Sequence, residues 1–161
     1  LNAIITLLKQ GFDIALMSDA GLPAFCDPGQ KLVKRCHEEN ITVTSAPFEN
    51  SISLALALSG IDHNEFHFAG FLPKEKSELN HKITELLKNK MTTILMDTPY
   101  RLQKTLSLIA KLSQSLQINK EFFLGMDLNK TEEKLIFTET KKVSNLEFNK
   151  KEFIIVLGKS S

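Results

Sequence analysis

Segments of helical periodicity alternate with short apolar segments over the first 60 residues, and this alternation restricts the fold more than any other feature of the sequence. Amphipathic helices carry apolar residues every three or four positions, whereas buried strands are short apolar or alternating runs. The order helix, strand, helix, strand, helix is typical of a parallel sheet whose strands are joined by crossover helices. The predicted helices are 1–10, 28–40 and 51–59, and the predicted strands are 13–17 and 41–45.

Capping residues mark the ends of these helices. Gly11 and Gly60 follow the first and third helices, where a glycine commonly ends a helix. Asp27 is predicted to be the N-cap of the second helix with Pro28 as its first residue, and Asn50 is a candidate cap for the third. The first part of the chain is therefore predicted to be an α/β unit.

The pattern changes near residue 62, where strands begin to outnumber helices. Because no helix separates the last two predicted strands, we expect them to form an antiparallel hairpin with a loose loop at 141–151. The predicted fold class is α/β: a parallel unit, 1–61, hinged near residues 60–62 to a second unit, 62–161, with a mixed sheet. In the second unit the predicted strands are 65–72, 91–97, 121–127, 134–140 and 152–158, and the predicted helices are 77–89 and 99–112.

Three of the predicted strands end with a methionine and an aspartate. Ligands in open α/β sheets bind outside the carboxyl ends of the strands, and carboxylates beside methionines suit a ligand that is cationic, hydroxylated and partly apolar. The alternative is that each aspartate caps the next helix and each methionine fills the core. The residues are Met17 with Asp19, Met96 with Asp97, and Met126 with Asp127.

Composition narrows the possible partners. A net charge of +1 produces no strong overall positive potential, so charge alone does not predict a nucleic-acid partner. The lysines between residues 74 and 104 have two interpretations: a solvated helix face, or a group that flanks an anionic substrate. No apolar run reaches the roughly 20 residues that a membrane span needs, so no membrane partner is expected. The two cysteines and four histidines lack the spacing of metal ligands, which predicts free thiols in a reducing cytoplasm and no metal site.

One segment resembles a known signature. Residues 15–33, ALMSDAGLPAFCDPGQKLV, are similar to the SDAG-x-P-x-x-x-DPG pattern of the tetrapyrrole methylase superfamily. Three later segments resemble, in the right order, patterns of the branch that includes ribosomal RNA small subunit methyltransferase I. These are LALALSGI to FHFAGFLPKEK at 54–76, TILMDTPYR at 93–101 and GMDLNKTEEKLIFTET at 125–140.

The resemblance implies a tetrapyrrole-methylase-like fold and a transferase that uses S-adenosylmethionine to methylate a ribose 2′-hydroxyl of ribosomal RNA. It implies ribosomal RNA or the small ribosomal subunit as the partner, a cytoplasmic location, and a fold that permits a homodimer. Asp97 is the predicted catalytic residue, which would remove the hydroxyl proton, and Lys74, Lys76 and Arg101 are predicted to hold phosphates. The residues implied to bind the methyl donor are Met17, Ser18, Asp19, Gly21, Leu22, Asn50, Ser51, Met96, Asp97, Gly125 and Met126.

The sequence departs from the family pattern at two places. The family opens with a strand and a glycine-asparagine loop that would precede Leu1, so the chain is expected either to be a fragment or to lack part of the site. In addition, APFENSI at 46–52 replaces the usual PGPSA, and Phe48 in place of glycine would crowd the loop that holds the adenosyl group. These departures leave open a degenerate non-catalytic module that binds a partner. The absence of a strong basic balance leaves open a methylase of a small tetrapyrrole-like acceptor.

Overall fold

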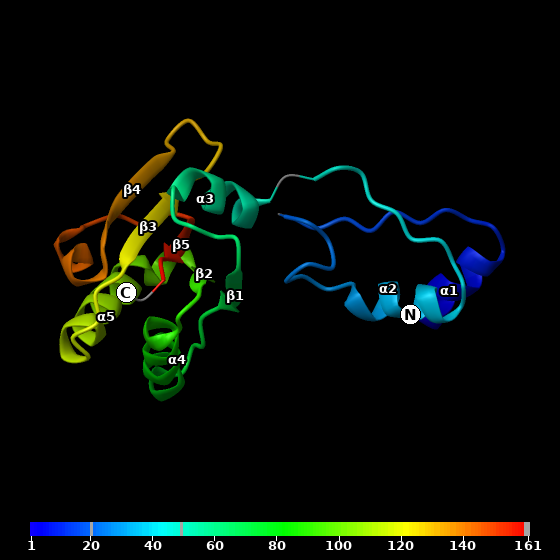
Figure 1. The fold of residues 1–161 in the computed structure, drawn as a ribbon. Coiled ribbons are helices and arrows are strands. Elements are labelled where there is room, and N and C mark those ends of the chain that lie inside the picture. The colour runs from blue at the N-terminus through cyan, green and yellow to red at the C-terminus, as the bar shows by residue number, and fades with distance from the viewer. Residues whose placement is uncertain (20, 49, 160–161) are drawn as a thin grey trace. The chain divides into compact units, whose positions relative to one another are not determined.

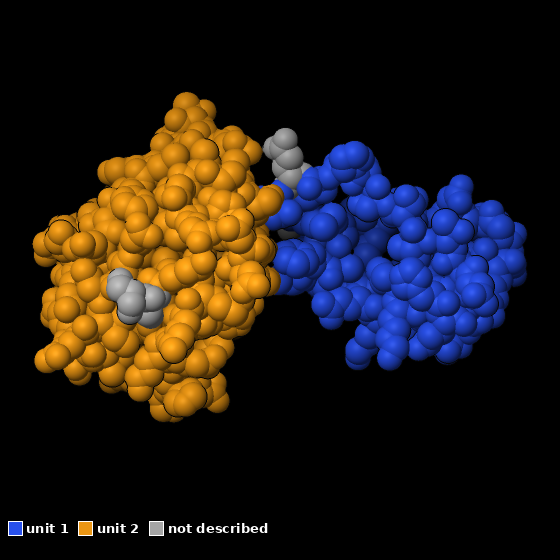
Figure 2. Space-filling model, viewed as in Figure 1, with its two compact units in different colours: residues 1–50 blue, residues 51–161 orange. Residues whose placement is uncertain are grey.

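The computed structural model describes residues 1–19, 21–48 and 50–159, so that Ala20 of the SDAG signature and Glu49 of the APFENSI segment lie outside it. The chain forms two compact units, unit 1 with residues 1–50 and unit 2 with residues 51–161 (Figure 2). The helix α3 (Ser51–Ser59) belongs to unit 2. The boundary between family domains that we expect at residue 61 stays a prediction.

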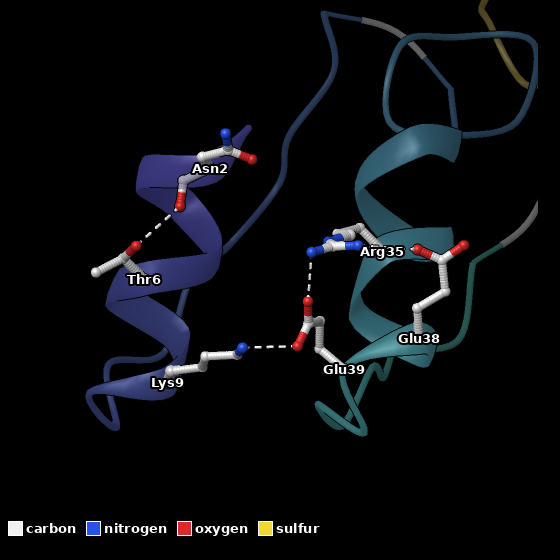
Figure 3. Close-up of polar contacts among 6 residues, drawn as sticks. All are labelled: Asn2, Thr6, Lys9, Arg35, Glu38 and Glu39. Carbon is white, nitrogen blue, oxygen red and sulfur yellow. Dashed lines mark hydrogen bonds and ion pairs between the residues drawn. The ribbon is translucent and has the colours of Figure 1, made fainter.

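Unit 1 holds two helices, α1 (Asn2–Lys9) and α2 (Gln30–Glu38), as their apolar spacing predicts. Glu39 joins them, because its carboxylate lies 2.6 Å from Lys9 Nζ and 2.5 Å from Arg35 Nη2 (Figure 3). The hydrogen bond from Lys9, assisted by the charges of both cations, lowers the pKa of Glu39. This shared carboxylate connects the last turn of α1 to the last turn of α2.

The predicted strands at 13–17 and 41–45 are wrong, since residues 1–19 and 21–48 contain no β-strand. A strand is maintained by hydrogen bonds to a neighbouring strand, and local apolar pattern cannot supply that neighbour. The two segments do not pair with each other here, and large apolar side chains on both remain exposed. These side chains are Ile14, Leu16, Met17 and Val43.

Unit 2 contains a five-stranded mixed sheet in the order β1-β2-β5-β3-β4 (Figure 1). The first pair is parallel and the other three pairs are antiparallel, which confirms the mixed sheet. The helices follow the predicted positions within a few residues, and Pro99 occupies the first position of η1 as expected. The elements are β1 (Phe66–Phe71), α4 (Lys76–Lys88), β2 (Thr92–Asp97), η1 (Pro99–Arg101), α5 (Leu102–Ser115), β3 (Glu121–Met126), β4 (Lys134–Glu139), η2 (Thr140–Asn145) and β5 (Phe153–Leu157).

The predicted hairpin of the last two strands is wrong. β4 pairs with β3 instead, whereas β5 lies between β2 and β3 at the centre of the sheet. All five residues of β5 are buried, and only a central strand has both edges paired and both faces covered. The connection that we expected to be a loose loop instead contains η2, whose Val143 packs into the core.

The two faces of the sheet pack against different helices. Alternate residues such as Leu95, Leu124 and Ile155 share a core with α4 and α5, while Ile94 and Ile154 share a smaller core with α3. In Figure 1, α3 and α4 flank the sheet on opposite sides. No helix of the described residues is long and apolar enough to cross a membrane.

Candidate functional site

The sheet aligns the ends of β2 and β3. Both strands run antiparallel to β5, so Met96 and Gly125 each pair with Ile154. One position further, Asp97 and Met126 each pair with Phe153. The structure therefore brings four of the predicted donor-binding residues to one end of the sheet.

These four residues are divided between the two faces. Met96 packs beside Ile154 on the face that α3 covers, and Gly125 has the same register. Met126, by contrast, is buried at 1% exposure in the core beneath α4 and α5, on the same face as Phe153. A ligand over the α3 face would therefore meet the side chain of Met96, but would reach Met126 only through its backbone.

Gly125 lies at the end of β3, where neighbouring side chains pack closely over its backbone. A Cβ atom at this position would lie 2.9 Å from Leu128 Cδ2, 3.3 Å from Phe123 Cε1 and 3.4 Å from Ile154 Cγ2. Contacts below 3.0 Å require a neighbour to move. Any larger residue would thus displace the side chains beside this part of the candidate site. Ser51, at the start of α3, is exposed.

Asp97 is buried and its carboxylate is fully engaged. Thr105 Oγ1 donates to Oδ2 at 2.7 Å, the backbone N–H of Thr98 donates to Oδ1 at 2.8 Å, and Arg101 Nη1 lies 3.2 Å from Oδ1. The carboxylate thereby joins the end of β2 to η1 and α5. Its predicted catalytic role stays a prediction, and these contacts favour a positioning role.

Arg101, which pairs with Asp97, also binds the loop before α4. Its guanidinium donates to the carbonyl of Pro73 at 2.6 Å and to that of Leu72 at 3.4 Å. The neighbouring Lys74 and Lys76 are exposed. Arg101 therefore fixes the loop that presents these two predicted phosphate-binding lysines, and its own charge is mainly used within the protein.

The predicted donor loop of unit 1 is closed by a hydrogen bond at its base. Ser18 Oγ donates to Asp27 Oδ2 at 2.7 Å. Asp27 was predicted to cap α2, but this is wrong: the N-cap is Gly29, with a φ of 142° that glycine adopts most readily, and no side chain caps the helix. The loop therefore uses Asp27 to hold its two ends together.

The other predicted residues of unit 1 leave the loop accessible. Met17 is 85% exposed, and Asp19 is exposed as well. Gly21 has a φ of 85° and open space where a Cβ atom would be, so its backbone can be approached closely. Leu22 and Asn50 are half-buried.

The third strand-end aspartate, Asp127, neither caps a helix nor joins this group. Its carboxylate pairs with Lys151 Nζ at 2.7 Å. Sequence reasoning also missed Thr105, although a threonine among apolar positions of a predicted helix is a visible signal. The pairing of Asp127 with Lys151 left no such local signal, since the two residues meet only through the fold.

Comparison with known families gives one match over most of the chain. The family described as Tetrapyrrole (Corrin/Porphyrin) Methylases matches residues 1–144. This range includes the signature at 15–33 and the strand ends of β2 and β3. The match confirms the family predicted from the motifs.

Several bacterial relatives share the name ribosomal RNA small subunit methyltransferase I. The one from Mesomycoplasma conjunctivae is 38% identical over 159 residues, covering 98% of this chain and 64% of the relative. The one from Thermotoga maritima is 33% identical over 134 residues, covering 78% and 60% respectively. The chain thus spans less than two thirds of these two relatives, and 70% of a relative from Hydrogenobaculum sp. that is 32% identical.

Solved structures support the same fold. The methyltransferase CobJ superposes with a TM-score of 0.64 at 10% identity, covering 98% of this chain and 69% of CobJ. The cobalt precorrin-4 methyltransferase CbiF gives 0.59 at 15% identity, covering 86% and 61%. At these identities the likeness establishes the fold alone, and it confirms the predicted α/β class. Taken with the family match over residues 1–144, the chain belongs to the tetrapyrrole (corrin/porphyrin) methylase family.

Proposed function

We propose that the protein is an S-adenosylmethionine-dependent methyltransferase that methylates a ribose 2′-hydroxyl of small-subunit ribosomal RNA. The observation that carries the proposal is the 38% identity over 98% of the chain to a ribosomal RNA small subunit methyltransferase I. The likeness to corrin methyltransferases concerns the fold, so it does not select the acceptor.

The chemistry of the predicted donor-binding residues fits the proposed donor. Exposed Asp19 supplies a carboxylate for ribose hydroxyls or an ammonium group, and the open backbone at Gly21 supplies amide groups. Met17 offers an exposed apolar thioether for the adenine. In unit 2, Met96 offers an apolar side chain, whereas Gly125 is buried with the side chain of Leu128 packed beside it. Each assignment rests on the geometry of its own unit.

S-adenosylmethionine supplies an electrophilic methyl group on a sulfonium. Since methyl transfer to a hydroxyl is an in-line displacement, the protein contributes mainly by orienting the reactants, which is worth roughly 7–11 kcal/mol in well-aligned pairs. We propose that the Ser18–Asp27 bond holds the donor loop and that Asp97, through Arg101, holds the loop carrying Lys74. Lys74 and Lys76 would then bind phosphates of the RNA.

Calorimetric titration with S-adenosylmethionine and S-adenosylhomocysteine tests the donor site. Asp19→Asn is expected to weaken donor binding about ten-fold, which corresponds to a lost charged hydrogen bond of roughly 1.4 kcal/mol. Asp13→Asn is the matched control, since Asp13 is also an exposed carboxylate of unit 1. Equal affinity of both variants and the unchanged protein would remove Asp19 from the site.

Methyl transfer to small ribosomal subunits tests the acceptor. Subunits from cells that lack the enzyme are incubated with radiolabelled donor, and the product is mapped for 2′-O-methylation. Transfer to a tetrapyrrole acceptor but not to the subunit would favour the small-acceptor alternative. Donor binding that appears only in Phe48→Gly would indicate that Phe48, which is 49% exposed, blocks the adenosyl loop. A cytoplasmic location and a homodimer remain predictions, to be checked by fractionation and by light scattering.

A further inference from the structure

Two aromatic side chains of unit 2 each lie beside a lysine ammonium. Lys150 Nζ is 3.7 Å from the centroid of the Tyr100 ring, and Lys134 Nζ is 5.0 Å from that of Phe148. Tyr100 is 79% exposed, so one face of its ring remains open beside the lysine. The Tyr100 pair therefore presents a flat apolar surface next to a positive charge, whereas Phe148 is half-buried and packs against the core, with Lys134 over its ring.

An open hollow of about 470 Å³ lies beside Phe148, and the fold holds its wall in place. It is lined by Gln103, Glu147, Phe148 and Asn149. Gln103 Nε2 donates to the carbonyl of Leu146 at 2.9 Å, while its Oε1 accepts from the backbone N–H of Phe148 at 3.3 Å. The segment that carries Phe148 is therefore tied to α5.

This surface begins at the end of the sheet where the candidate site lies. Tyr100 is three residues beyond Asp97 in β2, and Lys150 is three residues before Phe153 of β5. Phe153 pairs with both Asp97 and Met126. A polymer that crosses Tyr100 and Phe148 would thus pass the ends of the strands that carry Met96 and Gly125.

Nearby ion pairs restrict what can bind here. Lys151 is neutralised by Asp127 at 2.7 Å and Lys130 by Glu152 at 2.7 Å, and Glu147 adds a negative charge to the hollow. Duplex nucleic acids depend on many uncompensated cations. Single strands gain a large share of their affinity from bases that stack on aromatic rings, with a few cations for the phosphates.

We propose that Tyr100, Phe148, Lys134 and Lys150, together the aromatic–lysine surface, bind single-stranded RNA next to the candidate site. This inference rests on the proposed function, because it assigns that function its RNA-contact surface. One base stacks on the open face of Tyr100 and the next contacts the exposed part of Phe148, while Lys150 and Lys134 meet the adjoining phosphates. Asn149 supplies an amide to the hollow, and the two hydrogen bonds of Gln103 hold its wall in place.

Fluorescence anisotropy with a labelled single-stranded RNA of about 12 nucleotides tests the surface at several salt concentrations. Tyr100→Ala is expected to weaken binding about ten-fold, whereas Tyr100→Phe keeps the ring and stays within about two-fold of the unchanged protein. Lys150→Gln is expected to reduce the slope of log affinity against log salt by about 1. Lys111→Gln, an exposed lysine elsewhere on α5, is the matched control and leaves the slope unchanged.

Donor titration and methyl transfer are measured on the same variants, so that the two proposals can fail separately. If the unchanged protein methylates subunits and binds RNA, but Tyr100→Ala and Lys150→Gln bind RNA equally well, the surface is refuted and the proposed function stands. If the variants lose binding to the small subunit while naked RNA binding is unchanged, the surface contacts protein and the RNA assignment is wrong. If the unchanged protein neither binds RNA nor transfers methyl groups, both proposals fail.

Discussion

The buried Lys120 makes the stability of unit 2 depend on pH in an unusual direction. Its side chain is 2% exposed, and its ammonium donates to the carbonyl of Asn89 at 2.6 Å and that of Leu86 at 3.4 Å, at the end of α4. Burial disfavours the charged form and lowers the pKa of Lys120 from 10.5 to about 8. In the unfolded chain the ammonium is hydrated and keeps its ordinary pKa.

The number of protons bound to Lys120 in the folded and unfolded chains sets how the free energy of unfolding changes with pH. Between pH 8 and 10.5 the unfolded chain holds a proton at this position that the folded chain has released, so the free energy of unfolding rises with pH in that window. With pKa values of about 8 and 10.5, the gain from Lys120 between pH 7 and 10 is about 2.5 kcal/mol. Lys130 and Lys151 have the opposite effect, because their acidic partners raise their pKa.

Urea denaturation of the unchanged protein and of Lys120→Met at pH 7 and pH 10 isolates this contribution. The difference between the two proteins removes the common effect of Lys130 and Lys151, and the unchanged protein should gain about 2.5 kcal/mol more than the variant. Lys111→Met, which removes an exposed lysine, is the control and should show no such difference. A pH dependence that is identical in Lys120→Met and the unchanged protein would refute the reasoning.

Three further substitutions test the polar and steric contacts of the candidate site. Thr105→Val removes the hydroxyl that donates to Asp97 and should lower the free energy of unfolding by about 1.5–3 kcal/mol. Thr105→Ser keeps a hydroxyl and should lower it by less. If urea denaturation gives the same free energy of unfolding for both variants, the hydrogen bond does not contribute as expected. Asp27→Ala opens the bond to Ser18 and should weaken donor binding in calorimetry without changing the helical circular dichroism, since Asp27 does not cap α2. Gly125→Ala forces a Cβ atom to 2.9 Å from a neighbouring side chain and should destabilise unit 2 by about 1–3 kcal/mol. A Gly125→Ala protein that melts at the unchanged temperature would show that the neighbouring side chain moves without cost.

Local patterns in the sequence predicted most elements of unit 2. Helices α4 and α5 and all five strands lie within a few residues of their predicted positions, because apolar spacing is a property of neighbours along the chain. The candidate residues at the ends of β2 and β3 were visible for the same reason. Their alignment was not, since it depends on both strands pairing with Ile154 and Phe153 of β5.

The predictions that the structure contradicts share one physical cause. Segments 13–17 and 41–45 have the apolar pattern of strands, but neither pairs with a strand within the described residues. β5 is the central strand of the sheet, although it comes last along the chain. Asp27 likewise has the sequence context of a helix cap but binds Ser18 instead. In each case the outcome depended on which partner the segment meets in the folded protein, and the local apolar or capping pattern does not specify that partner.

The sequence by itself therefore determined the family, the element types and the residues available to the site, because signatures and periodicity are local and can be read directly. Only the tertiary structure decided which strands pair, that Asp97 and Arg101 form one connected group with Thr105, and that Lys120 is buried at the end of α4. Forming these contacts costs conformational entropy, and the free energy of packing the whole of unit 2 offsets this cost. No segment of the sequence could specify them alone.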